Sequence, residues 1–100
     1  MVVEVRQLLT RLEQSGCSFN RNGTWYNGPE AKSHLQRKYD YLVKRNLVNS
    51  SEQFIERGAS RSSFSGRAYT VRCGEQVEES RSYLLRMLQR IRSGEFSAKP

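Results

Sequence analysis

The segment from Ser60 to Gly66 holds the side chains best suited to bind an anion. It contains four serines and one arginine, and Arg67 follows directly. Hydroxyls, backbone amides and guanidinium groups are the donors that bind phosphate or carboxylate in proteins. The candidate binding residues here are Arg61, Ser62, Ser63, Ser65 and Arg67. The alternative is that the serines and the glycine only satisfy a tight connection between a helix and a strand.

Trp25 is a second candidate for binding. Together with Tyr26, Arg21 and Arg72 on neighbouring predicted strands, it could form an aromatic and basic surface that stacks on a sugar or a nucleobase. It could equally pack beneath a helix, because a small sheet can be covered on either face. The sequence leaves both interpretations open.

His34 is the only histidine of the chain. Ser33 and Asp40 lie one and six residues away on the expected helix, so neither faces it as a catalytic partner. We therefore expect a structural polar contact, directed to the serine-rich loop, rather than catalysis. Two cysteines and one distant histidine do not supply the four ligands of a metal site, and no motif indicates a cofactor.

Four segments have the spacing of amphipathic helices, with apolar residues three or four positions apart. They are residues 2–14, residues 28–45, a short segment that ends near Gly58, and a last segment that begins at Ser80. Asn27 with Glu30 resembles a capping box, and Ser80 is expected to cap the last helix. The residues expected on the buried faces are Val5, Leu8, Leu9, Leu12, Ala31, Leu35, Tyr39, Leu42, Leu84, Leu88 and Ile91.

A small antiparallel sheet is predicted between these helices. Asn22-Gly23 favours a two-residue hairpin between strands 18–21 and 24–26, in which Phe19 pairs with Tyr26. Residues 67–73 alternate as a third strand, and residues 74–79 are interpreted as a polar link. The predicted fold class is therefore α+β, with four helices packed on a hairpin plus a third strand. Residues 1–93 are expected to form one domain, and residues 94–100 a disordered tail.

The two cysteines have the strand positions that a disulfide needs. Cys17 precedes the first strand and Cys73 ends the third, so antiparallel pairing of these strands brings both sulfurs to the core side. A disulfide would indicate an oxidising compartment. The alternative is a pair of buried, reduced thiols in a cytosolic protein.

The charge balance favours anionic partners. The chain of 100 residues has a net charge of +7, and four arginines between Arg57 and Arg72 meet no carboxylate. The excess is spread along the chain rather than gathered in a basic tail. No apolar run approaches the roughly 20 residues that span a bilayer, and no signal-peptide core is present.

Several motifs together resemble the YfeK-like family of small bacterial proteins, a domain of unknown function. They are "FNRNG", "EAxxHLxxKY" from Glu30 to Tyr39, "SEQFIERGAS" from 51 to 60 and "SxSGRAYTVRC" from 63 to 73. The resemblance implies an exported, periplasmic protein whose signal peptide is absent from this sequence. It implies no activity and no catalytic residue.

These observations favour a periplasmic, non-catalytic binding or interaction module for an anionic envelope component or a protein partner. A nucleic-acid-binding basic domain is the first alternative, although the basic residues do not concentrate on one recognition helix. A small enzyme that uses the Ser60–Gly66 loop is the second alternative, and it lacks an acid or base that we can place beside the serines.

Overall fold

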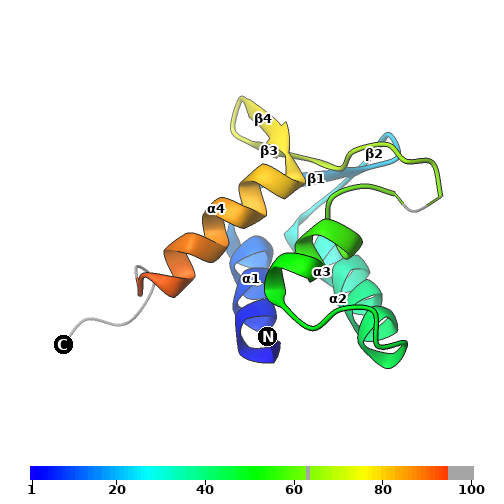
Figure 1. The fold of residues 1–100 in the computed structure, drawn as a ribbon. Coiled ribbons are helices and arrows are strands. Elements are labelled where there is room, and N and C mark those ends of the chain that lie inside the picture. Colours follow the sequence, from blue (N-terminus) through cyan, green and yellow to red (C-terminus); the bar gives the residue numbers. More distant parts are fainter. Residues whose placement is uncertain (63, 95–100) are drawn as a thin grey trace.

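The described part of the chain contains four helices and four strands (Figure 1). The structure is a computed structural model and describes residues 1–62 and 64–94. Its elements in chain order are α1 (Val2–Gln14), β1 (Ser18–Arg21), β2 (Thr24–Tyr26), α2 (Gly28–Lys44), α3 (Ser51–Gly58), β3 (Thr70–Cys73), β4 (Gln76–Glu79) and α4 (Ser80–Arg92). The predicted α+β class with four helices is confirmed. Of the tail predicted from residue 94, all but Gly94 lies outside the described residues.

The hairpin of β1 and β2 forms as the Asn22-Gly23 pair predicts. Both turn residues have positive φ, 54° at Asn22 and 87° at Gly23, as a type I′ turn requires. Phe19 pairs with Tyr26 across the strands, so the predicted register is confirmed. Because side chains alternate along a strand, this register fixes which residues of the hairpin face the helices.

The capping box predicted at the start of the second helix is confirmed, since α2 begins with a complete one. The Asn27 side chain accepts from the Glu30 amide and the Glu30 carboxylate accepts from the Asn27 amide, both at 2.9 Å. Gly28 lies against α1 so closely that a Cβ there would be 2.4 Å from the Glu13 carbonyl oxygen. Of the predicted inward-facing residues, all are buried except Ile91, which is partly buried.

The sheet has one strand more than predicted. Its order is β2-β1-β3-β4, and every neighbouring pair is antiparallel. The segment interpreted as a polar link contains β4, and β3 begins at Thr70 rather than at residue 67. Strand β4 lacks an apolar alternation because it is an edge strand, held by its backbone pairing to β3 and by Glu78, which binds Arg86 of α4.

Ser80 does not cap α4, so that prediction is wrong. Glu79 is the N-cap residue and makes no side-chain cap, while Ser80 is the first helical residue. The Ser80 amide donates to the Tyr69 carbonyl at 2.9 Å and thereby continues the β3–β4 ladder by one step. This bond turns the serine inward, where its hydroxyl is buried and has no hydrogen-bond partner.

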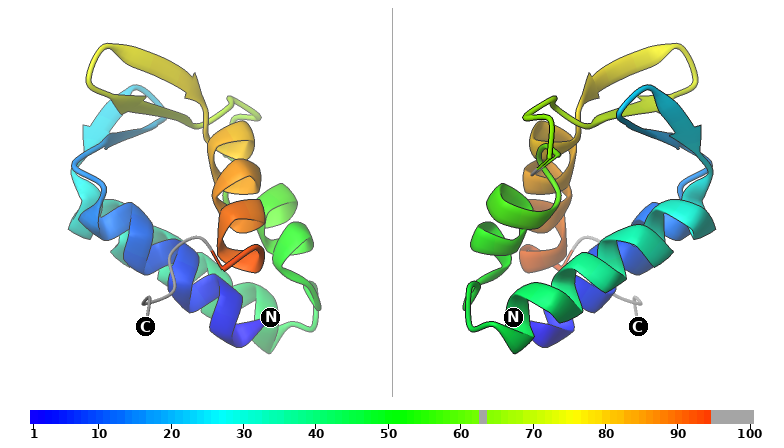
Figure 2. Two further views of the ribbon diagram at one scale, coloured as in Figure 1. Left: turned by 90° about the vertical axis from the view of Figure 1, so that its left-hand side faces the viewer. Right: turned by 90° about the vertical axis from the view of Figure 1, so that its right-hand side faces the viewer.

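The helices all lie on one side of the sheet, and the other side is uncovered (Figure 2). Phe19, Tyr69 and Val71 point to the helices and are buried. Trp25 and Val77 point away from them and are exposed. The inner face therefore contributes to the hydrophobic core, whereas the outer face meets solvent.

The disulfide joins Cys17, just before β1, to Cys73, at the end of β3, with 4.4 Å between the Cα atoms. In the β1–β3 register, Ser18 lies opposite Arg72, so the next pair outward is Cys17 and Cys73. This is the pairing that the strand positions predict.

Candidate anion-binding site

The loop between α3 and β3 uses its hydroxyls to hold itself together. The Ser62 hydroxyl accepts from the amides of Phe64 and Ser65, at 3.1 and 3.2 Å, and from the side-chain amide of Asn22 at 3.3 Å. The Ser65 hydroxyl donates to the Asn22 side-chain oxygen at 2.7 Å and accepts from the Arg67 amide at 3.2 Å. These hydrogen bonds fasten the loop to the hairpin turn, and the hydroxyls do not form an open anion cradle. The other predicted residue of this set, Ser63, lies outside the described residues.

The two arginines of the loop have different surroundings. Arg61 lines a cavity of about 570 Å³ on α3, and the carboxylates of Glu52 and Glu56 line the same cavity. The Arg67 guanidinium reaches the hairpin turn, where a Cβ at Gly23 would lie 3.9 Å from its Nη1. Both arginines are exposed. Arg67 therefore lies beside the hairpin turn, and Arg61, whose backbone pairs with Ala68, lies on the same loop at the edge of a cavity that acidic side chains also line.

Trp25 lies on the surface and not beneath a helix. Its side chain is 40% exposed on the outer face of the sheet, and the Arg72 guanidinium lies 4.7 Å from its ring centre. Tyr26 and Arg21 alternate to the inner face, since Tyr26 is paired with the buried Phe19. The single aromatic and basic surface that the sequence suggested is thus divided between the two faces.

His34 contacts the hairpin and its own helix. Its ring packs edge-on against Tyr26 with 4.6 Å between centres, and its Nδ1 lies 3.0 Å from an Arg37 nitrogen. The contact with the serine-rich loop that we expected is therefore wrong, because this face of α2 meets β2 instead. Burial, followed by the charges of Arg21 and Arg37, lowers the pKa of His34 below 6.5. Because a guanidinium can only donate, the Nδ1 of His34 is the acceptor in its contact with Arg37.

Two further cations converge on the hydroxyl of Tyr69. Lys38 Nζ lies 3.4 Å from the Tyr69 oxygen and 5.4 Å from the ring centre. Asn20 pairs with Thr70, so the next position along β1 places Arg21 opposite Tyr69 on the inner face. A hydrogen bond to the Tyr69 phenol raises the pKa of Arg21. We call the group formed by Arg21, Tyr26, His34, Arg37, Lys38 and Tyr69 the basic cluster.

No carboxylate of residues 1–62 and 64–94 forms an ion pair with the basic cluster. The ion pairs between described residues join Lys32 to Glu13, Arg81 to Glu56, Arg86 to Glu78, and Arg92 to both Glu4 and Glu52. None of them reaches Arg21, Arg37 or Lys38. Glu30 acts on His34 only through its charge, as the weakest of the named influences on the pKa of that imidazole.

The position of Arg21 on the inner face could have been predicted from the sequence. The hairpin register that it predicted places Arg21 and Tyr26 on the same face, away from Trp25. Lys38 lies four residues after His34 and so shares its face of the helix. The predicted pairing of Cys17 with Cys73 also places Arg21 opposite Tyr69. What the sequence could not provide is the contact of Lys38 with Tyr69, because that depends on how α2 packs on the sheet.

The family of unknown function DUF5329 matches residues 1–92 of the chain. The chain belongs to this family. It is also similar to the uncharacterized protein YfeK of Salmonella typhimurium, with 39% identity over 66 residues, which are 65% of this chain and 53% of that protein. The chain thus spans about half the length of the curated relative it matches. No solved structure matches.

No helix of the described residues is long and apolar enough to cross a membrane. Within residues 1–62 and 64–94, no three histidine, cysteine, aspartate or glutamate side chains converge as metal ligands.

Proposed function

We propose that residues 1–93 form a periplasmic, non-catalytic binding domain that recognises an anionic component of the bacterial envelope. The observation that carries this proposal is the unequal pairing of charges. The carboxylates of Glu4, Glu13, Glu52, Glu56 and Glu78 are bound by basic side chains of the helices. The cations around the hairpin have no such partners among the described residues and are available to a ligand.

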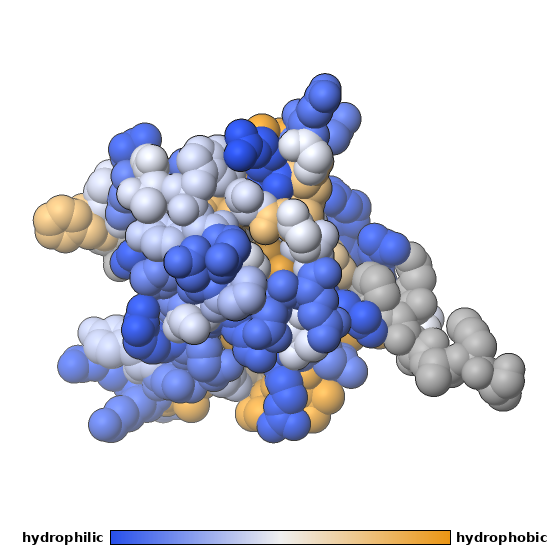
Figure 3. All heavy atoms as spheres, turned by 180° about the vertical axis from the view of Figure 1, so that it is seen from behind, coloured by the Kyte–Doolittle hydropathy of each residue, from blue (hydrophilic) through white to orange (hydrophobic). Residues whose placement is uncertain are grey.

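The surface character supports a charged partner. Seen from behind, the molecule displays mainly hydrophilic side chains, with hydrophobic ones in small separate groups (Figure 3). This face offers charged and polar groups rather than one broad apolar area. The disulfide between Cys17 and Cys73 supports the compartment, because such bonds persist where the surroundings are oxidising.

Retention on immobilised heparin, used as a polyanion, tests the ligand class. We expect the Arg61→Ala, Arg67→Ala double variant to fold normally and to elute at lower salt than the unsubstituted chain, because phosphate- and sulfate-like groups bind guanidinium strongly. The matched control is Arg6→Ala, Arg45→Ala, which removes the same charge from exposed positions on α1 and at the end of α2. An equal shift in both variants would show that only net charge matters and would end the proposal of a directed surface.

The compartment is tested on the protein expressed with its natural leader. After fractionation, alkylation and mass measurement, we expect the protein in the periplasmic fraction with both cysteines protected. Cytoplasmic protein with two alkylated thiols would contradict the proposal. It would also return nucleic acid as the polyanion of first interest.

A further inference from the structure

We infer that the basic cluster binds a phosphoryl group, with Arg21 and Lys38 as its charged ligands and the Tyr69 hydroxyl between them. This inference rests on the proposed function and names the ligand of the same basic surface.

The first argument is convergence. Arg21 comes from β1, Lys38 from α2 and Tyr69 from the residue before β3. Lys38 Nζ is 3.4 Å from the Tyr69 oxygen. Arg21 lies one residue beyond the last β1–β3 pair, Asn20 with Thr70, and its side chain hydrogen-bonds to the Tyr69 phenol. Three separate elements therefore direct their donors to one point.

The second argument is electrostatic. Two like charges beside one neutral phenol repel each other, and the effect is larger where the surroundings are partly buried. Arg21 and Lys38 are both half-buried, Tyr69 is 1% exposed, and no described carboxylate pairs with either cation. A bound anion would replace the repulsion by two attractive contacts.

The kind of anion follows from the donors. A guanidinium offers a planar fork, an ammonium offers a point charge, and a phenol offers one hydrogen bond. A tetrahedral phosphoryl group presents oxygens in several directions and carries up to two negative charges, which match one arginine and one lysine. A carboxylate presents two oxygens in one plane and one charge, so it would leave part of the cluster unpaired.

The outer side chains of the basic cluster reach solvent, whereas Tyr69 lies buried beneath them. Tyr26 and His34 are partly exposed, and Arg37 is fully on the surface beside His34. Arg37 is therefore placed at the rim, where it can contact the remainder of a larger ligand. The phosphoryl end would lie deeper, against Tyr69.

The test is a calorimetric titration of the folded chain with inorganic phosphate, followed by sulfate and acetate. We expect phosphate to bind in a one-to-one ratio, sulfate to compete with it and acetate to fail. Lys38→Met should weaken phosphate binding at least about tenfold. The matched control Lys44→Met, an exposed lysine at the end of the same helix, should bind phosphate as before. Equal loss in both variants, or acetate binding as tightly as phosphate, would overturn the inference.

A second variant guards against loss of folding. Tyr69→Phe removes the hydroxyl and keeps the buried ring, so its circular dichroism spectrum should match that of the unsubstituted chain while phosphate binding falls several-fold. Undiminished binding by a folded Tyr69→Phe chain would contradict the assignment of the hydroxyl. Vesicles of phosphatidylglycerol, tested beside inorganic phosphate, distinguish a lipid headgroup from a soluble phosphate, and loss of either in Lys38→Met supports the site.

Failure here and failure of the proposed function are distinguishable. If heparin retention depends on Arg61 and Arg67 but no phosphate binds, the inference is wrong and the proposed function stands. If phosphate binds and is lost in Lys38→Met, while both heparin variants shift equally, the inference stands without the wider polyanion surface.

Discussion

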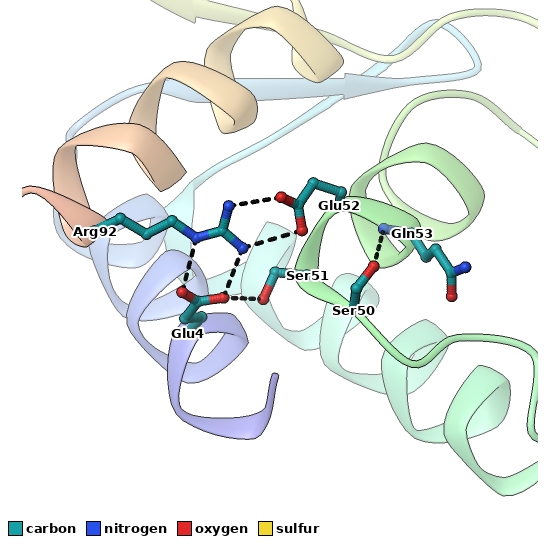
Figure 4. A network of polar contacts seen from close by, with 6 residues as sticks. All are labelled: Glu4, Ser50, Ser51, Glu52, Gln53 and Arg92. Atoms are coloured by element: carbon teal, nitrogen blue, oxygen red, sulfur yellow. Dashed lines mark hydrogen bonds and ion pairs between the residues drawn. The ribbon is translucent and has the colours of Figure 1, made fainter.

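The helical end and the hairpin end of this molecule are held together by different forces. At the helical end, Arg92 of α4 binds Glu4 of α1 and Glu52 of α3, at 2.8 and 2.6 Å (Figure 4). At the hairpin end a disulfide joins β1 to β3, and Arg21 and Lys38, at the opposite end of the same strand pair, have no described acidic partner. Ion pairs therefore join α1, α3 and α4, whereas a covalent bond joins the strands and the basic side chains around Tyr69 pair with no described carboxylate.

The helical network is complete in itself. The Arg92 guanidinium donates to both carboxylates through all three of its nitrogens, and the Ser51 hydroxyl donates to Glu4 at 2.6 Å. Three helices are thereby connected through one side chain (Figure 4). Such a planar, multidentate arrangement is the geometry in which an arginine pair contributes most. Nothing in it is free to bind a further anion.

The largest expected effect comes from breaking the covalent link. Cys17→Ser should lower the free energy of unfolding by about 4 kcal/mol, because the disulfide closes a loop between residues 56 positions apart. Urea unfolding in oxidising buffer measures it. Adding reductant to the unsubstituted chain should produce the same loss, and reductant should not affect the variant further. If the substitution leaves the urea midpoint of unfolding unchanged, the hairpin end is held by packing rather than by the disulfide.

The second largest effect is the loss of stability at the helical end when the pH is lowered. Hydrogen bonds from Arg92 and then Ser51 lower the pKa of Glu4 from 4.5 to about 2. The folded state therefore binds this proton less readily than the unfolded state, so the stabilisation is present above pH 4.5 and is lost as the pH falls toward 2. Since the side chain is partly exposed, we expect a contribution of about 1 kcal/mol.

Thermal unfolding of Glu4→Gln between pH 2 and 6 measures this contribution. The variant should be less stable than the unsubstituted chain above pH 4.5, and the two should converge at the acid end. The matched control is Glu75→Gln, at an exposed turn position. An identical pH profile for all three chains would show that the network adds no stability.

The sequence predicted the parts of the fold that depend on local chemistry. Asn22-Gly23 can adopt positive φ at little cost, and Asn27 with Glu30 satisfies the first amides of a helix, so both features are legible from neighbouring residues. The structure confirms both of these short-range constraints. The pairing of Cys17 with Cys73, 56 positions apart, is the exception, since it was predicted from antiparallel pairing of the first and third strands, with reduced thiols as the alternative.

The features that failed depend on distant pairing. Strand β4 exists because β3 offers it a backbone partner, and its own residues carry little strand preference. Ser80 was predicted to cap α4, but its amide donates to the Tyr69 carbonyl and Glu79 is the N-cap residue instead. The serines of the predicted anion-binding loop do not form an open site for the same reason, since Ser62 is hydrogen-bonded to Asn22, 40 residues away in the sequence. The basic cluster likewise requires the sheet to be assembled before its members meet.

The smallest expected effect sharpens the comparison most, because the change in stability should differ between two lysines of one helix. Lys32 is paired with Glu13 at 3.2 Å, whereas Lys38 faces Tyr69 and Arg21. Lys32→Met should lower stability by up to about 0.5 kcal/mol, since an exposed ion pair is lost. Lys38→Met should leave it unchanged or raise it by a similar amount, because a repulsion is removed while the side-chain stem is kept. Both differences should shrink at high salt. If Lys38→Met instead costs more than about 1 kcal/mol, then Lys38 is a structural residue, and the charge at the hairpin end is not held in reserve for a ligand.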